Sequence, residues 1–386
     1  MAGIYIHIPY CQRKCAYCDF VSYADQSTLG AYVDAVKSEA ELYSQMLAWK
    51  RFDTVFIGGG TPSILPAESI AAILDAVRRS FNVAESAEIT IECNPCSITD
   101  EKLAAYYDCS INRISVGMQS DDDAVLKAIG RLHTKAVFEQ AMNSIAKSSI
   151  VNRNVDIMYG LPLQTTGGFI RTLKYAVSLP INHISAYSLI LEEGTPLFDR
   201  LNSDQTELPS EDDCADMEEE CHRILCDVGF TRYEVSNYAK PGYQCRHNLN
   251  YWDNGEYIGL GVAAHSAIRA EKQWTRFSNF TDVKAYIDRV TMGIVPCKNV
   301  MTIDKREEMF ESIMLGLRKT DGIRMDDFSK RFGVDIMDEY RDVIAKFVYD
   351  KLLYCRENKL FCSPRGMSVL NIITEAFYEH MTATEP

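Results

Sequence analysis

Along the first half of the chain, segments with the apolar pattern of a strand alternate with segments that have the apolar pattern of a helix. Short runs rich in β-branched and aromatic residues are each followed by a segment in which apolar residues recur at helical spacing. The β-rich runs lie at residues 3–8, 54–57, 88–92, 113–116, 154–159 and 183–190. Because strands that are separated by helices pair in parallel, this pattern predicts an α/β fold built on a parallel sheet.

Two of the predicted helices show the helical period clearly. One apolar face steps by 4, 4, 3 and 4 residues through Tyr32, Val36, Ala40, Tyr43 and Leu47. The next helix carries an equivalent face formed by Ile70, Ile73, Leu74 and Val77. Six strand and helix units within about 190 residues suit either a doubly wound sheet or an incomplete barrel related to the eightfold one.

The second half of the chain has a different organisation. Residues 203–213 are rich in acidic and turn residues and indicate a linker into a helix over about 212–228. After Pro296 the pattern predicts a helix, two short helices, a hairpin at 352–362 and a final helix, which is typical of a winged-helix-like unit. We therefore predict three domains, over residues 1–205, 206–300 and 301–386.

Composition and charge narrow the classes of function. The 386 residues are 47% apolar and carry a formal net charge of -14, which argues against a general binder of nucleic acid or of membrane surfaces. Residues 321–386 also hold 9 Lys or Arg against 12 Asp or Glu, so the winged-helix-like unit is not expected to bind DNA. No apolar stretch approaches the roughly 18 residues of a membrane span. The strand-like start and the 13 scattered cysteines predict a cytoplasmic protein without a disulfide framework.

Polar residues follow the predicted strands at the points where the strands end. A Gly-Gly-Gly-Thr-Pro-Ser run at 58–63 follows the second strand, Glu92 ends the third, Gln119 follows the fourth and Asp156 lies in the fifth. Carboxyl ends of parallel strands meet at one mouth, where such folds bind ligands. The glycine run is either a tight turn or a set of exposed N–H groups that hold an anion. Carboxylates within apolar strands indicate a function, because they are rarely buried without a partner.

The strongest chemical signal is the spacing C-x3-C-x2-C formed by Cys11, Cys15 and Cys18 in a loop after the first strand. Three thiolates are one short of the four that saturate an iron-sulfur cluster, so one iron would stay open to a second molecule. Two alternatives remain at this point, namely plain packing of buried cysteines and a zinc site with His7 as the fourth ligand. The spacing favours the cluster over both.

The ordered motifs resemble those of radical S-adenosylmethionine proteins, over essentially the whole chain. They are His-Ile-Pro-Tyr-Cys-x3-Cys-x2-Cys, Gly-Gly-Gly-Thr-Pro-Ser, Glu-Cys-Asn-Pro, Val-Gly-Met-Gln-Ser, Gly-Arg-Leu-His-Thr and Asp-Ile-Met-Tyr-Gly-Leu-Pro. The nearest branch is the oxygen-independent coproporphyrinogen III dehydrogenase group. This resemblance implies a partial (β/α)6 TIM-like barrel over 1–205, followed by an α+β extension and the winged-helix-like unit.

The same resemblance implies the cofactors and the residues that hold them. A 4Fe-4S cluster is expected on Cys11, Cys15 and Cys18, with S-adenosylmethionine chelating its fourth iron through the methionine amine and carboxylate. The candidate residues for binding S-adenosylmethionine are Tyr5, Tyr17, Gly59, Gly60, Thr61, Glu92, Gln119, Arg131 and Asp156. Within this set, Arg131 changes from an expected solvated cap to an expected ligand, because a guanidinium suits bidentate binding of a carboxylate.

Two features place the chain in the branch of HemW-type haem chaperones. The dehydrogenases carry an additional N-terminal segment and a cysteine two residues after the third ligand, where this chain has Phe20. The run His-Asn-x-x-Tyr-Trp that begins at His247 resembles the haem-binding signature of the chaperones, with His247 as the expected axial ligand. The resemblance therefore implies haem as cargo and respiratory haem proteins at the membrane as acceptors, with homodimerisation left open. The competing functions are an active coproporphyrinogen III dehydrogenase and a zinc-stabilised interaction module.

Overall fold

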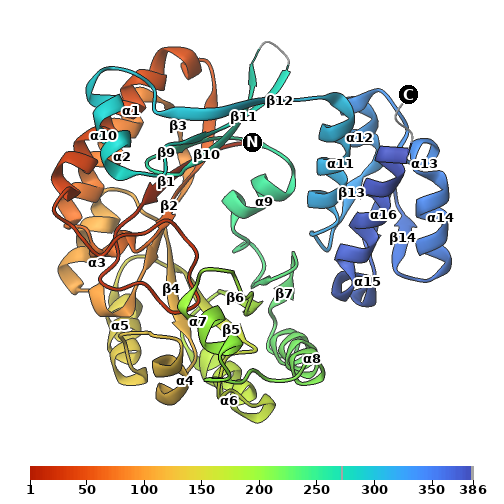
Figure 1. Cartoon of the computed structure of the whole chain (residues 1–386), viewed down its shortest axis with the longest axis horizontal. Helices are drawn as coiled ribbons and strands as arrows, with labels where there is room; N and C mark the ends of the chain where they lie inside the picture. Colours follow the sequence, from red (N-terminus) through yellow and green to blue (C-terminus); the bar gives the residue numbers. More distant parts are fainter. Residues whose placement is uncertain (271–272, 384–386) are drawn as a thin grey trace.

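A computed structural model describes residues 1–270 and 273–383 of the chain. Six parallel strands form its centre, in the order in which they occur in the sequence (Figure 1). They are β1 (Ala2–Ile8), β2 (Arg51–Gly59), β3 (Asn82–Cys93), β4 (Arg113–Gln119), β5 (Asn152–Tyr159) and β6 (His183–Ser188). The strand pattern of the sequence is confirmed, except that residues 189–190 lie beyond the end of β6.

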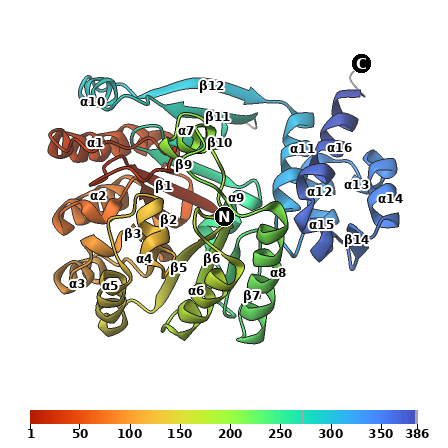
Figure 2. The same ribbon diagram turned by 60° about the horizontal axis from the view of Figure 1, so that its bottom comes forward.

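Helices follow the strands and lie along the outside of the curved sheet (Figures 1 and 2). They are α1 (Leu29–Leu47), α2 (Ala67–Ser80), α3 (Asp100–Asp108), α4 (Asp123–Ala128), α5 (Lys135–Lys147), α6 (Thr166–Ser178), α7 (Pro196–Asn202) and α8 (Glu211–Asp227). The predicted apolar faces of α1 and α2 are buried, as is the outer face of β1 with Ile4, Ile6 and Ile8. These residues belong to one continuous core between sheet and helices.

The six strands do not close into a complete barrel. The free side of β1 pairs with β9 (Glu256–Leu260), and the free side of β6 pairs with β8 (Asn237–Ala239). The helices that connect the six strands lie on the outer face of the sheet (Figure 2), whereas the connecting helices of a doubly wound sheet lie on both faces. The expected incomplete barrel is therefore confirmed.

The extension continues the sheet to twelve strands and adds one helix inside its curve. Its further elements are β7 (Thr231–Arg232), α9 (Arg246–Trp252), β10 (His265–Ala270), β11 (Gln273–Asn279), α10 (Val283–Thr291) and β12 (Cys297–Ile303). The edge strand β12 was not predicted, because four consecutive residues of it, 299–302, are exposed and show no alternation of buried and exposed positions. The helix α9 lies beside the amino terminus of the chain in Figure 1.

The C-terminal unit has a core of its own and lies apart from the barrel (Figure 1). Its elements are α11 (Lys305–Gly316), β13 (Ile323–Arg324), α12 (Met325–Phe332), α13 (Ile336–Glu339), α14 (Arg341–Tyr349), β14 (Leu353–Arg356), β15 (Lys359–Cys362), α15 (Pro364–Ser368) and α16 (Leu370–Ala383). The predicted hairpin is formed by β14 and β15, and β15 also pairs with β13 to complete a three-stranded antiparallel sheet. This arrangement of helices and a small sheet agrees with the winged-helix-like prediction.

The division into domains at 205/206 and 300/301 stays a prediction. Residues 271–272 and 384–386, which fall within the second and third predicted domains, lie outside the described residues. Within the part of the chain that the structure describes, no helix combines the length and hydropathy that a membrane span requires.

Candidate functional site

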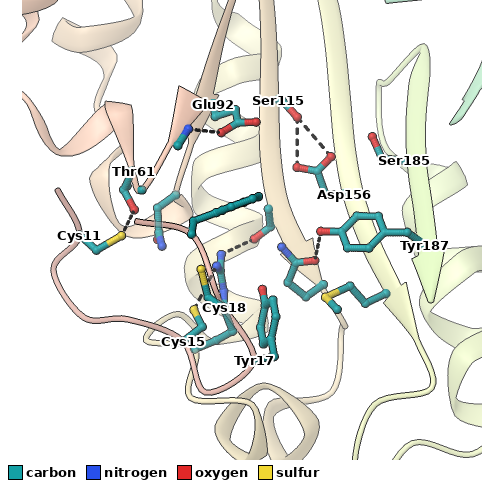
Figure 3. A pocket seen from close by; sticks show the side chains of 18 of the residues that line it. Cys11, Cys15, Tyr17, Cys18, Thr61, Glu92, Ser115, Asp156, Ser185 and Tyr187 are labelled. Atoms are coloured by element: carbon teal, nitrogen blue, oxygen red, sulfur yellow. Dashed lines mark hydrogen bonds between the residues drawn. The ribbon is translucent and has the colours of Figure 1, made fainter. Parts of the chain in front are cut away.

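A pocket of about 550 Å³ opens at the carboxyl ends of the parallel strands (Figure 3). The loop after β1 forms one wall, and the ends of β2 to β6 form the floor and the opposite wall. Eleven of the predicted site residues line it, namely Cys11, Cys15, Tyr17, Cys18, Gly59, Gly60, Thr61, Glu92, Gln119, Arg131 and Asp156. The rule that parallel strands present their functional residues at one mouth therefore applies to this chain.

The three cysteines of the spacing motif are free thiols on the pocket wall. Hydrogen bonds from the amide of Cys11 to the carbonyl of Tyr23 and from the amide of Ala16 to the carbonyl of Ile129, both 3.0 Å long, hold the loop in place. The thiol of Cys11 lies 3.3 Å from the hydroxyl of Thr61. Burial raises the pKa of Cys18 to about 11. Burial also raises the pKa of Cys11, so a bound metal group would be needed to hold these two side chains as thiolates.

This donor set fits an iron-sulfur cluster better than a single metal ion. Among the described residues, no three His, Cys, Asp or Glu side chains converge as ligands of one ion would. Cysteine ligands of a cluster bind separate iron atoms and therefore stand apart from one another. His7 is also occupied, because its Nε2 lies 2.9 Å from the carbonyl of Val21 and its Nδ1 lies 3.0 Å from the hydroxyl of Tyr5. The arrangement argues against the zinc alternative.

The glycine run lets the backbone of β2 approach the cysteine loop. A Cβ at Gly60 would lie 2.8 Å from the carbonyl oxygen of Tyr10 and 3.1 Å from Sγ of Cys11. Gly59 has a φ of +112°, and a Cβ there would lie 2.6 Å from the ring of His7. A residue with a Cβ could not lie this close to the cysteine loop and to His7 without displacing them.

Two carboxylates face the pocket from neighbouring positions. An oxygen of Glu92 accepts a hydrogen bond of 3.1 Å from the amide of Gly59. Asp156 accepts from the hydroxyl of Ser115 at 3.1 and 3.2 Å and from the amide of Asn154 at 2.7 Å. Burial raises the pKa of both groups, that of Glu92 to about 8 with a further contribution from Asp156. A cationic ligand in the pocket would favour their charged forms.

Arg131 and Gln119 stand close to the same pocket. The guanidinium of Arg131 donates to the carbonyl of Gly117 at 2.7 Å and lies 3.7 Å from the thiol of Cys15. Its Nε is buried and has no partner among the described residues. Gln119 has a φ of +65° and accepts a hydrogen bond of 3.2 Å from Tyr187. A buried guanidinium with a donor to spare beside a cysteine fits a carboxylate ligand.

Three further pocket residues were not found from the sequence. Ser115, Ser185 and Tyr187 line the pocket from β4 and β6 (Figure 3). Alternation along each strand was the available signal, because side chains two residues apart point to the same face. The position of Asp156 on β5 identifies that face, since Asp156 pairs with Ser185 of β6.

Tyr5 does not line the pocket. Its hydroxyl lies 3.0 Å from Nδ1 of His7, and its ring stacks on that of Phe56 at 6.4 Å. Tyr5 therefore belongs to the inner face of the barrel wall, and its expected contact with the cofactor is not formed by the pocket described here.

The structure also keeps His247 away from the pocket. His247 is 1% exposed on α9, near the amino ends of β1 and β2 and thus at the opposite end of the barrel. Its Nδ1 lies 2.8 Å from the hydroxyl of Thr54, and its Nε2 lies 2.9 Å from the hydroxyl of Tyr251. Burial, followed by the charge of Arg113, lowers the pKa of the imidazole to about 3. In this conformation both ring nitrogens are hydrogen-bonded to protein side chains.

Comparison with known proteins gives consistent results. Residues 5–176 match the model of the radical SAM superfamily, and residues 303–369 match that of the HemN C-terminal domain. The chain is 32% identical over 377 residues to Heme chaperone HemW of Lactococcus lactis, covering 97% of this chain and 96% of that protein. With Heme chaperone HemW of Bacillus subtilis it shares 31% over 379 residues, covering 98% and 99% of the two chains.

The fold has a close counterpart among solved structures. Coproporphyrinogen III oxidase (HemN) from Escherichia coli, a radical SAM enzyme, superposes with a TM-score of 0.84 over 97% of this chain and 89% of that chain. The two sequences are 21% identical, so this likeness establishes the shared fold alone.

Proposed function

The chain belongs to the HemW haem chaperone family of the radical S-adenosylmethionine superfamily, and from this membership we propose that it binds haem and delivers it to respiratory haem proteins. The radical SAM fold implies S-adenosylmethionine and a 4Fe-4S cluster as cofactors. The observation that carries the cofactor part of the proposal is one pocket that contains three free cysteines beside a glycine cradle, two carboxylates and an arginine.

Different residues of the pocket are proposed to bind different parts of the two cofactors. We propose that Cys11, Cys15 and Cys18 hold the cluster and that the spare Nε donor of Arg131 binds the methionine carboxylate. Glu92, which already accepts from the amide of Gly59, has a second oxygen for the methionine ammonium. When bound, the cluster supplies an open iron and one-electron chemistry at the sulfonium.

Asp156 is proposed to accept from the ribose hydroxyls of the nucleoside. Ser115 and Asn154 hold its carboxylate in a fixed orientation, so little conformational entropy is lost on binding. Tyr17, which is partly buried against the apolar cluster of Val125, Ile129, Met158 and Leu161, provides a wall that excludes water from the pocket. Space for the ligand is left by Gly59, Gly60, Thr61 and Gln119, which also form part of the pocket surface that it would contact.

Haem coordination by His247 requires a conformational change. Both of its ring nitrogens are hydrogen-bonded, and the ring stacks on Phe56 at 5.2 Å. We propose that His247 reaches haem iron only after α9 has left the end of the barrel. Removing the Tyr251 hydroxyl with Tyr251→Phe should then strengthen haem binding, while His247→Ala should abolish it. Equal haem spectra for both variants and the wild type would exclude His247 as a ligand.

The proposed cargo and acceptor are tested with reconstituted protein. The full chain, loaded with cluster and S-adenosylmethionine without air, is titrated with haem and then mixed with the apo form of a respiratory b-type cytochrome. Appearance of the cytochrome spectrum at the expense of the chaperone's Soret band supports delivery. His265→Ala, at an exposed position, is the matched control for the histidine variants.

The same preparation tests the competing enzyme function. Phe20 is 59% exposed at the pocket, at the position where the resemblance places an additional cysteine in the dehydrogenases. We therefore expect coproporphyrinogen III to keep its mass on incubation with the protein and a reductant. Decarboxylated product would replace the chaperone proposal with the enzyme. Homodimerisation and a cytoplasmic location stay predictions.

A further inference from the structure

Arg113, the first residue of β4, is a buried cation that no described residue pairs directly. It is 2% exposed, its Nε has no hydrogen-bond partner, and within the described part of the chain its guanidinium forms no ion pair shorter than 4.0 Å. Isolated buried charges are costly, so proteins retain them where the charge has a use. Arg113 is therefore the interior residue whose role most needs an explanation.

Glu88, a carboxylate whose charge acts on Arg113, already accepts from other donors. Glu88 accepts hydrogen bonds of 3.1 Å from the amides of Arg246 and His247 at the start of α9. Titratable and charged groups face Arg113 from every surrounding element. They are Glu88 and Glu92 on β3, Asp156 on β5, His183 on β6, Tyr233 after β7, and Cys245 and His247 at α9.

Arg113 lies one step along the strand from the carboxylates of the pocket. The neighbouring inward position on β4 is Ser115, whose hydroxyl donates to both oxygens of Asp156. In the sheet, Ser115 pairs with Glu92 while Arg113 pairs with Thr90. The guanidinium therefore lies under the floor of the pocket, on the same inner face as Glu92 and Asp156. Its charge lowers the pKa of both carboxyl groups, against burial, which raises it.

We propose that Arg113 is a positioning residue for S-adenosylmethionine, whose buried positive charge balances Glu92 and Asp156 so that both meet the ligand as carboxylates. This inference rests on the proposed cofactor function of the pocket. Without Arg113, the carboxyl groups of Glu88, Glu92 and Asp156 would lose the buried cation whose charge acts on all three. Glu92 and Asp156 would then take up protons more readily and become weaker acceptors for an ammonium or a hydroxyl.

The test measures the affinity of the full chain, reconstituted without air, for S-adenosylmethionine between pH 6 and pH 9. We expect Arg113→Gln to weaken binding at least tenfold at pH 7. The ratio of wild-type to variant affinity should fall as the pH rises, because at higher pH Glu92 and Asp156 ionise even without the charge of Arg113. Taking the ratio of the two affinities cancels the effect of the ligand's own amine titration, because this effect is the same for both proteins. Arg113→Lys, which keeps the charge, should bind nearly as well as the wild type.

Controls separate this role from a structural one. Arg113→Met provides a second neutral variant of similar length, should Arg113→Gln fail to fold. Arg153→Gln, which removes an arginine bound to backbone carbonyls of Ile150 and Pro180, should leave the pH dependence unchanged. In an Asp156→Asn background, Arg113→Gln should lose most of its effect, because the two residues act together.

The outcomes are distinct from those that test the cofactor function itself. If the wild type binds S-adenosylmethionine and the neutral variants bind with the same affinity and pH profile, the role of Arg113 is wrong while the proposed function stands. An equal loss at every pH also contradicts it and assigns a structural role. If the wild type itself does not bind S-adenosylmethionine, the proposed function fails.

Discussion

Gly60 lies directly against Cys11, and a methyl group on Gly60 would stand 3.1 Å from the Cys11 sulfur. The same methyl group would lie 2.8 Å from the carbonyl of Tyr10 and 3.0 Å from that of Ile8. Since backbone atoms cannot rotate away as a side chain does, the cysteine loop must shift to accept it. We predict that Gly60→Ala lowers the iron and acid-labile sulfide retained per chain several-fold after anaerobic reconstitution.

Gly167→Ala is the matched control for this prediction. A Cβ at Gly167, in the first turn of α6, meets nothing within 4 Å, so this variant should reconstitute like the wild type. Full cluster content in Gly60→Ala would mean that the loop accommodates the methyl group and that the close approach has no role.

Glu39 is predicted to make the stability of the fold depend on pH. This fully buried carboxyl group on α1 accepts from the amides of Gly261 and Asn279 and from the hydroxyl of Tyr286, yet burial raises its pKa from 4.5 to about 7. The folded state therefore holds the proton more tightly than the unfolded state. The contribution of Glu39 to the free energy of unfolding is fully present below about pH 4.5. It is lost as the pH rises through 7, and the total loss is about 3 kcal/mol.

The measurement is the free energy of urea unfolding at several pH values from 5 to 8. The difference between wild type and Glu39→Gln should fall with rising pH, because glutamine does not titrate. Glu41→Gln, at an exposed position of the same helix, should give a constant difference. A constant difference for Glu39→Gln as well would refute the assignment.

His247 is predicted to stabilise the end of the barrel whatever its role toward haem. His247→Ala removes two hydrogen bonds and a ring stacked on Phe56, and it leaves the hydroxyls of Thr54 and Tyr251 without this partner. We expect the cofactor-free protein to lose about 2–4 kcal/mol of stability. Urea unfolding followed by circular dichroism measures it, and an unchanged midpoint would show that α9 is not anchored by this ring.

The part of the fold that depends on local periodicity was predictable. The apolar faces of α1 and α2 follow from spacing alone, since a helix with one apolar stripe has only one way to face a core. The pocket followed from a second rule, because residues after parallel strands meet at one edge. Cys15 and Asp156, far apart in the sequence, were placed in one site by that rule.

The remainder depends on contacts between distant segments. His247 lies in a motif whose resemblance implied coordination of haem iron. The helix α9 packs against the amino ends of β1 and β2, and no local sequence pattern predicts this long-range contact. Tyr5 lies outside the pocket lining for a related reason, because its alternating position fixes its face of the strand but not its distance from the pocket mouth, and its contact with the cofactor stays a prediction. The burial of Arg113 was not predicted, since a single arginine at the start of a strand is usually exposed.

We propose that three cysteines of one loop hold a cluster, which in turn anchors S-adenosylmethionine. The most direct test determines iron, acid-labile sulfide and S-adenosylmethionine affinity of the full chain after anaerobic reconstitution, beside a variant carrying Cys11→Ser, Cys15→Ser and Cys18→Ser. We expect about four iron atoms and four sulfide ions per wild-type chain. The variant should lose both, and its affinity for S-adenosylmethionine should be at least tenfold weaker. A wild type without sulfide, or a variant that binds S-adenosylmethionine as tightly as the wild type, would contradict it.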